Sequence, residues 1–277
     1  MKLEAYAKVN LTLEVFGKRP DGYHALRSFV APISLSDTIE IEVTDDGSIV
    51  SDAGYPDDLC VKAATALREA FCIQNGPGAA IRVFKRIPAG GGLGGGSADA
   101  AAVLRGLNDL WGCGFDLERL AEIGAKVGSD VPSLLFRRPV VMEGRGELVA
   151  PVAYTPGFNM VVASPGVHCS TAEVYRACVP RQASEDSPTS EMLAAYSAGD
   201  VARVAAALVN DLQAPAIALH PEISALMQKL RDAGAEGVMM SGSGSCVFAL
   251  AKDSASATEL AAEMNRQTVK AWAVCTV

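Results

Sequence analysis

The residues best suited to chemistry in this chain form a glycine-rich run between Pro88 and Asp99. A backbone with few Cβ atoms can wrap its N–H groups around an anion, because nothing blocks close approach and positive φ costs little. A helical pattern follows over 98–110, with Ser97 as its expected N-cap, and unpaired N–H groups at a helix start also attract anions. The run is therefore predicted to bind phosphate groups through Gly90, Gly91, Gly92, Gly94, Gly95 and Gly96.

Other interpretations of the glycine run are weaker. A flexible linker is not usually flanked by a strand pattern, here 80–86, and a helix. The P-loop ends in Gly-Lys-Ser or Gly-Lys-Thr, and no Lys follows these glycines. The dinucleotide pattern is met by Gly90, Gly92 and Gly95, as it would be almost by default in such a run. Its ribose-binding acid would be Asp116, which follows no strand and is predicted to cap its own helix.

Two further segments carry polar side chains at spacings that could serve catalysis. In the alternating segment 5–13, Lys8 and Asn10 share one face of a predicted strand. Taken alone, this alternation favours a solvated polar face. In Gly-Ser-Asp-Val-Pro, residues 128–132, Asp130 is most simply a turn residue that satisfies local N–H groups. A Gly-Ser segment at 241–245 is likewise most simply a tight turn.

Composition and charge restrict the class of protein. The 277 residues are 49% hydrophobic and 20% charged, which is typical of one large or two medium globular domains. A net charge of −8 argues against nucleic-acid binding, although local fields can still bind an anionic small molecule. Seven scattered cysteines without a C-x-x-C pair favour free thiols, and no apolar signal or membrane segment is found. We therefore expect a cytoplasmic location and no membrane partner.

The elements that position these residues alternate irregularly, which favours an α+β fold over βαβ repeats. A boundary marked by Pro and Gly falls near 154–157. Before it we expect strands at 3–15, within 27–50, and at 80–86, 138–142 and 147–152, with helices at 58–71, 98–110 and 117–127. After it we expect strands at 159–164, 246–250 and 269–276, helices at 190–198, 200–209, 221–233 and 256–268, and a mobile surface loop at 181–190.

Taken together, these segments resemble the GHMP kinases, the family of galactokinase and of homoserine, mevalonate and phosphomevalonate kinases. The resemblance lies in Lys-Val-Asn-Leu at 8–11, the glycine run, Gly-Ser-Asp-Val-Pro at 128–132 and the turn at 241–245. It spans nearly the whole chain and is weakest at 179–200. The segment 19–26, which contains Asp-Gly-Tyr-His, is more specific. It resembles family members that phosphorylate the 2-hydroxyl of 4-diphosphocytidyl-2-C-methyl-D-erythritol in isoprenoid precursor synthesis.

The resemblance implies an organisation in two domains with the active site between them. The first, 1–154, would be ribosomal-protein-S5-like, bind ATP and carry the catalytic residues. The second, 155–277, would be ferredoxin-like and bind the substrate, and whether the last strand returns to the first domain is left open. ATP and Mg²⁺ are the implied cofactors, and a cytidine diphosphate alcohol is the implied small-molecule partner. We expect a monomer or a weak homodimer.

The resemblance also implies roles for individual residues. Lys8 and Asp130 would form the catalytic pair, since a carboxylate can orient or deprotonate a hydroxyl while an ammonium keeps it ionised. Ser97 would lie near Mg²⁺. The implied ATP-binding residues are Pro88, Gly90, Gly91, Gly92, Gly94, Gly95, Gly96, Ser97 and Asn108. The implied substrate-binding residues are Asn10, Tyr23, His24, Tyr175, Gly242 and Ser243, of which Tyr23, His24 and Tyr175 would hold the cytosine.

Two other functions remain open at this point. A GHMP kinase acting on a smaller alcohol would not need the segment Asp-Gly-Tyr-His. A nucleotide-binding or regulatory module without catalysis would tolerate the loss of Lys8 or Asp130, yet both are present. His168 and His220 match no motif and are expected to be structural.

Overall fold

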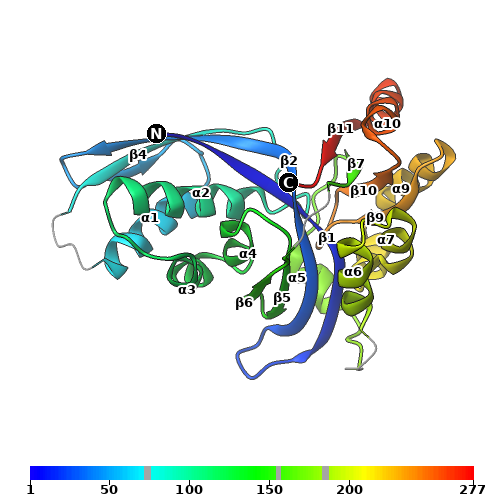
Figure 1. Ribbon diagram of the computed structural model, residues 1–277, viewed down its shortest axis with the longest axis horizontal. Helices are drawn as coiled ribbons and strands as arrows, with labels where there is room; N and C mark the ends of the chain where they lie inside the picture. The colour runs from blue at the N-terminus through cyan, green and yellow to red at the C-terminus, as the bar shows by residue number, and fades with distance from the viewer. Residues whose placement is uncertain (72–75, 154–156, 183–186) are drawn as a thin grey trace. The chain divides into compact units, whose positions relative to one another are not determined.

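The computed structural model describes residues 1–71, 76–153, 157–182 and 187–277. The chain forms two compact units, each of which has most of its residue contacts within itself (Figure 1). The first unit comprises 1–7, 35–89 and 94–137, and the second comprises 8–34, 90–93 and 138–277. Each unit contains both strands and helices, as the predicted α+β class requires. The predicted domain boundary at 154/155 stays a prediction.

The first unit is built on the outer ends of two long strands, β1 (Lys2–Lys18) and β2 (His24–Thr44). Strand β4 (Gly78–Phe84) pairs antiparallel with β2, and β3 (Ile49–Ser51) pairs parallel with β4. Four helices lie on one side of these strands (Figure 1). They are α1 (Leu59–Ala70), α2 (Gly95–Leu110), α3 (Leu117–Val127) and α4 (Val131–Leu135).

Local chemistry explains where these helices begin. The side chain of Asp116 accepts a hydrogen bond from Arg119 N at 2.8 Å, so its predicted role as an N-cap is confirmed. The predicted N-cap of α2 is wrong. Helix α2 begins at Gly95, and its N-cap is Gly94, which has a φ of 69°. The glycine loop can turn directly into the helix because Gly94 tolerates the left-handed region. Ser97 thus lies inside the first turn of α2.

The second unit contains two sheets. In the first sheet, the inner parts of β1 and β2 are joined by β5 (Val140–Gly144), β6 (Leu148–Pro151) and β8 (Val209–Asn210). The second sheet has the antiparallel order β11-β7-β10-β9. Its strands are β7 (Asn159–Ser164), β9 (Glu236–Met240), β10 (Val247–Ala251) and β11 (Lys270–Cys275).

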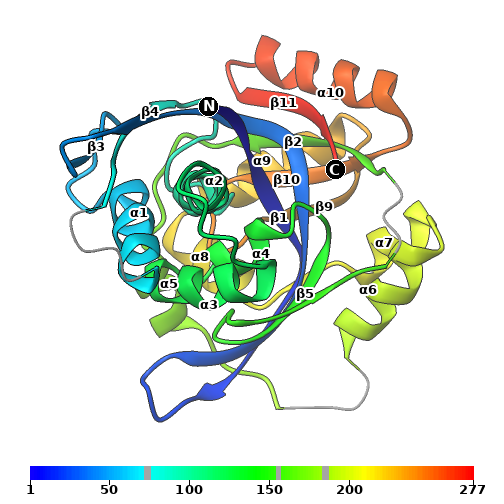
Figure 2. The same cartoon turned by 60° about the vertical axis from the view of Figure 1, so that its left-hand side comes forward.

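Helices α9 (Glu222–Asp232) and α10 (Ser254–Arg266) lie against the second sheet (Figures 1 and 2). They bury Leu226 and Met264 in one apolar cluster with Val161 and Val247 of the sheet. Because each such side chain contributes about 1.5–3 kcal/mol on burial, this layer stabilises the unit. The remaining helices are α5 (Thr171–Ala177), α6 (Pro188–Ser197), α7 (Val201–Ala207) and α8 (Gln213–Leu219).

Several predicted elements differ from the structure. The stretch 27–50 was expected to hold two or three strands, whereas β2 runs through to Thr44 and only β3 follows. Helix α7 ends at Ala207, because Val209 and Asn210 pair with β1. The short elements α4, α5, α8 and β9 carry too few turns or alternations for periodicity to reveal them. The predicted loop at 181–190 falls partly outside the described residues, and from Pro188 on it is helix α6.

Candidate active site

The first part of the glycine loop packs against the turn at 241–244, in the second unit. Ser241 Oγ donates a hydrogen bond to Gly92 O at 3.0 Å, and Cys246 N donates one to Gly91 O at 3.0 Å. A Cβ atom on Gly92 would lie 2.1 Å from Ser241 O, and the φ of Gly92 is 73°. Both the space and the backbone conformation therefore require glycine at this position.

Lys8 and Asn10 lie beneath that turn. Lys8 N donates to Leu93 O of the glycine loop at 3.0 Å, and Lys8 Nζ donates to Asn10 Oδ1 at 2.6 Å. Asn10 Nδ2 in turn donates to Ser28 Oγ at 2.8 Å. Lys8 is 3% exposed and Asn10 is 2% exposed. The expectation of a solvated polar face is therefore wrong, because the glycine loop and the turn cover this face of β1.

The turn approaches these two side chains closely. A Cβ atom on Gly242 would lie 3.2 Å from Lys8 Nζ and 3.4 Å from Asn10 Oδ1, and the φ of Gly242 is 55°. Asn210 Nδ2 donates to the carbonyl oxygens of Met240 and Gly242, each at 2.8 Å. This buried amide fixes the turn, yet no sequence pattern singled out Asn210.

Ser243 occupies the tip of the same turn. Its hydroxyl forms a hydrogen bond of 2.8 Å with Thr171 Oγ1, at the start of α5. Because α5 also carries Tyr175, this bond joins the turn to the helix that bears one of the predicted cytosine-binding rings.

The structure brings two of the three predicted cytosine-binding side chains together. The rings of His24 and Tyr175 are stacked, with centroids 5.6 Å apart and an interplanar angle of 27°. Tyr23 lies outside this stack and is 52% exposed. The guanidinium carbon of Arg145 lies 5.2 Å from the centroid of the Tyr23 ring, a cation–π contact that sequence reasoning missed.

His168 also belongs to the surroundings of the loop. A Cβ atom on Gly90 would lie 2.2 Å from His168 Nδ1, so the imidazole packs directly on the glycine loop. The expectation of a structural role for His168 is compatible with this packing, but no motif indicated its place beside the loop.

The second part of the glycine loop belongs to the first unit, where it forms the N-terminus of α2. The Ser97 hydroxyl makes no hydrogen bond within the described part of the chain. A Cβ atom on Gly128 would lie 3.8 Å from Ser97 Oγ, so the segment that carries Asp130 approaches the first turn of α2. Asp130 is the N-cap of α4 by position, but its side chain makes no capping hydrogen bond there.

A buried ionic cluster beside this turn escaped sequence reasoning. Lys85 Nζ lies 2.5 Å from an oxygen of Asp37 and 2.7 Å from an oxygen of Asp99. It also lies 3.4 Å from where a Cβ atom on Gly95 would stand. Burial raises the pKa of Asp99 to about 7, against the opposing charge of Lys85. Burial alone would lower the pKa of Lys85, but Asp99 and Asp37 outweigh it and raise that pKa.

The remaining predicted ATP-binding residues differ in their exposure and in the hydrogen bonds that they already make. Asn108 Nδ2 donates to Phe115 O at 3.1 Å, and its Oδ1 accepts from Phe115 N at 3.0 Å. These bonds orient the amide, which keeps one N–H and one oxygen lone pair for a contact with adenine. Pro88 is half-buried and Gly96 is exposed. No group of three or more His, Cys, Asp or Glu side chains in the described ranges could hold a metal ion.

Family models match both halves of the chain. The model described as the GHMP kinases N terminal domain matches residues 58–138, and the one described as GHMP kinases C terminal matches residues 192–270. The chain belongs to the GHMP kinases. The predicted family and its two-domain α+β fold are thereby confirmed, and membership of this kinase family implies the use of ATP.

Individual relatives cover this GHMP kinase along its full length. It is 40% identical to the 4-diphosphocytidyl-2-C-methyl-D-erythritol kinase of Symbiobacterium thermophilum, over 100% of both chains. It is 41% identical to the enzyme of the same name from Pelotomaculum thermopropionicum, over 95% of this chain and 93% of the relative. A crystal structure of a 4-(cytidine 5'-diphospho)-2C-methyl-D-erythritol kinase matches with a TM-score of 0.85 at 38% identity, over 100% of both chains.

More distant structures share the fold alone. A homoserine kinase from Cytophaga hutchinsonii matches this GHMP kinase with a TM-score of 0.78 at 17% identity, over 100% of this chain and 94% of that one. Across the parts of the chain that the structure describes, no helix is long and apolar enough to cross a membrane.

Proposed function

We propose that this kinase transfers the γ-phosphate of ATP to the 2-hydroxyl of 4-diphosphocytidyl-2-C-methyl-D-erythritol, a step in non-mevalonate isoprenoid precursor synthesis. Full-length relatives with that named activity support the proposal. The observation that carries it is the stack of His24 on Tyr175. A flat aromatic surface with an adjacent imidazole can bind a pyrimidine by stacking and by hydrogen bonds to its edge.

The glycine loop would hold the phosphates of ATP. Its backbone approaches without Cβ atoms, and the N-terminus of α2 adds unpaired N–H groups and partial positive charge. The implied contacts are those of Pro88, Gly90, Gly91, Gly92, Gly94, Gly95, Gly96 and Ser97, with Asn108 nearer the adenine. Phosphoryl transfer depends mainly on such positioning and on electrostatic stabilisation.

The residues fit a magnesium ion carried by ATP. Mg²⁺ usually keeps several waters and takes one or two protein oxygens besides the phosphates, so a dedicated acidic cage is not required. The Ser97 hydroxyl is suitable, because it lies in the first turn of α2 and is not used as an N-cap. Bound Mg²⁺ would neutralise phosphate charge, and Ser97 would orient it.

Lys8 and Asp130 are the proposed catalytic residues. The Asp130 carboxylate would accept or orient the proton of the attacking hydroxyl. The Lys8 ammonium, buried and held by Asn10, would stabilise the charge on the transferred phosphoryl group. Asn10 would also contact the substrate near its reacting hydroxyl. The backbone at Gly242 and Ser243 would approach the diphosphate of the substrate, and Tyr23 would contact its cytosine.

One experiment separates this function from its alternatives. ATP turnover is measured with Mg²⁺ and 4-diphosphocytidyl-2-C-methyl-D-erythritol, with bare methylerythritol phosphate, and without an acceptor. We expect kcat/KM for the cytidine conjugate to exceed that for the bare alcohol by orders of magnitude. Equal kcat/KM for the two acceptors would indicate a kinase that acts on a smaller alcohol. No turnover with any acceptor would favour a nucleotide-binding module without catalysis.

We further propose that the enzyme works in the cytoplasm as a monomer or weak homodimer, on small molecules and not on nucleic acid. The described cysteines are all free, as a reducing compartment would allow, and the net charge is −8. Sedimentation across a range of concentrations would test the oligomeric state. Separate expression of 1–154 and 155–277 would test the proposed domain boundary.

A further inference from the structure

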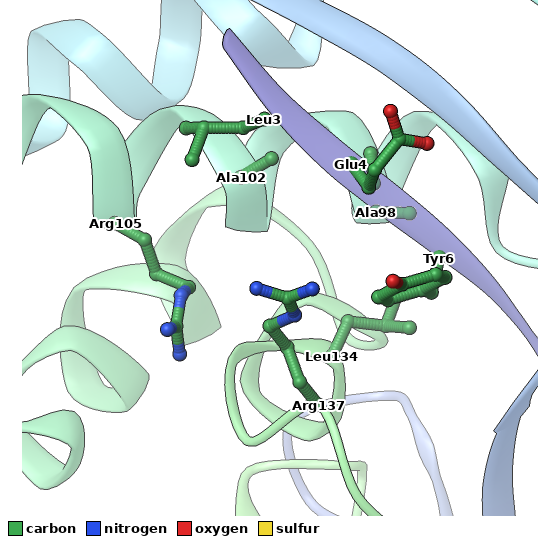
Figure 3. Close-up of a pocket in the computed structure, with 9 residues that line it drawn as sticks. Leu3, Glu4, Tyr6, Ala98, Ala102, Arg105, Leu134 and Arg137 are labelled. Atoms are coloured by element: carbon green, nitrogen blue, oxygen red, sulfur yellow. The ribbon is translucent and has the colours of Figure 1, made fainter. Parts of the chain in front are cut away.

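A small pocket in the first unit lies outside the residues assigned to ATP and substrate (Figure 3). We call it the arginine pocket. Its polar side chains are those of Glu4, Tyr6, Arg105 and Arg137. Leu3, Ala5, Ala98, Ala102 and Leu134 form its apolar wall. Strand β1, helix α2 and the segment after α4 thus contribute to one cavity.

The side chains of Arg105 and Arg137 both reach into the region between α2 and the segment after α4 (Figure 3). Arg105 is half-buried and Arg137 is exposed, and neither forms an ion pair with a carboxylate of the described residues. Arg105 Nη1 donates to Leu135 O at 2.8 Å, and the Arg137 guanidinium carbon lies 4.8 Å from the Tyr6 ring centroid. These contacts orient both groups without cancelling their charge.

The two nearby acids, Glu4 and Asp109, form no ion pair with either arginine. Glu4 lines the pocket, but its carboxylate points away in Figure 3 and accepts hydrogen bonds from Ser36 and Thr38. Asp109 lies one turn beyond Arg105 on α2, is exposed, and forms no ion pair with it. Burial, together with the charge of Arg137, lowers the pKa of Arg105, and the charge of Asp109 opposes this shift. The positive charge of the two guanidinium groups is therefore only partly offset by the nearby carboxylates.

The backbone at Arg137 is a second sign of a specialised position. Its φ is 49°, in the left-handed region that residues other than glycine rarely adopt. Backbone conformations of this kind persist only where the surrounding structure holds them, and they gather at binding sites. Here the conformation belongs to a residue whose charge acts on Arg105.

We propose that the arginine pocket binds a phosphate-type oxyanion, either free or as the end group of a small metabolite, at a site separate from that of ATP. Two guanidinium forks match the charge and the planar donor geometry that such an anion requires, and the Tyr6 hydroxyl adds a third donor. Glycine residues of the ATP loop begin α2, and Asp130 immediately precedes α4. A bound anion would therefore brace the two helices that carry these residues.

Calorimetric titration with inorganic phosphate, pyrophosphate and glycerol phosphate tests the proposal. It is run on the full chain with Mg²⁺ and a saturating non-hydrolysable ATP analogue, so that the ATP site is occupied. The informative variants are Arg137→Asn, which keeps a residue tolerant of positive φ, and Arg105→Gln. The matched control is Arg119→Gln, an exposed arginine of the same unit that is paired with Glu122.

We expect the parent and Arg119→Gln to bind phosphate with the same Kd. For each pocket variant we expect the Kd to rise about tenfold, as the loss of a charge-assisted hydrogen-bond pair predicts. Circular dichroism verifies that each variant is folded. Tight binding of glycerol phosphate would indicate the end group of a metabolite, and binding of the inorganic anions alone would indicate free phosphate. The proposal is overturned if the parent binds none of the three, or if the pocket variants bind as tightly as the control.

Discussion

Replacing Gly92 by alanine tests the role of the glycine loop most directly. The new Cβ atom would lie 2.1 Å from Ser241 O, so either the loop or the turn at 241–244 must move. Alanine at a φ of 73° adds about 1–2 kcal/mol of backbone strain. Loss of the hydrogen bond from Ser241 Oγ to Gly92 O adds about 1 kcal/mol. The loop conformation is therefore destabilised by about 2–3 kcal/mol.

We take ATP to bind only the native conformation of the loop. The destabilisation of about 2–3 kcal/mol then raises the Kd for ATP about 30- to 150-fold, because about 1.4 kcal/mol corresponds to a factor of ten. The assay is calorimetric titration with a non-hydrolysable ATP analogue, accompanied by thermal unfolding to verify that the variant is folded. Gly17→Ala is the control, because a Cβ atom there meets nothing within 4 Å. A folded Gly92→Ala protein with the ATP affinity of the control would refute the reasoning.

Three further predictions concern individual side chains. Asp130→Asn should lower kcat by about 10² to 10⁴ while the Kd for ATP stays within threefold, and steady-state kinetics with turnover near the parent value would exclude Asp130 as orienting group or base. Tyr175→Ala should raise KM for the cytidine substrate about 5- to 150-fold, from the loss of about 1–3 kcal/mol of stacking, and an equal rise in KM for ATP would point to general damage instead. Asp99 has a folded-state pKa raised by burial to about 7 from 3.8, so its contribution to stability is present below pH 3.8 and is lost as pH rises toward 7. Asp99→Asn should reduce the change in the free energy of unfolding between pH 3.8 and pH 7. Urea titrations at several pH values measure this free energy. If it changes with pH in the variant as it does in the parent, the raised pKa is contradicted.

Local features of this protein could be predicted because they depend on residues close together in the chain. The cap at Asp116 needs only an acid three residues before a free N–H group, and the structure has that bond. The strand character of β1 follows from its alternation, and the predicted phosphate loop follows from six glycines before a helical pattern. Ser97 shows where this reasoning stops. Its type suits an N-cap, but the loop glycines allow the helix to begin earlier, at Gly95.

Which surfaces are covered, and by what, was decided only in the tertiary structure. Alternation places Lys8 and Asn10 on one face of β1, but their burial depends on a turn more than two hundred residues away in the chain. The contact of His168 with Gly90 and the cluster of Lys85 with Asp37 and Asp99 have the same origin. Periodicity reports the face on which a side chain stands and carries no information about the segment that packs on it. That choice depends on the packing of the whole chain, because burial and close approach are properties of pairs of segments and not of either segment alone.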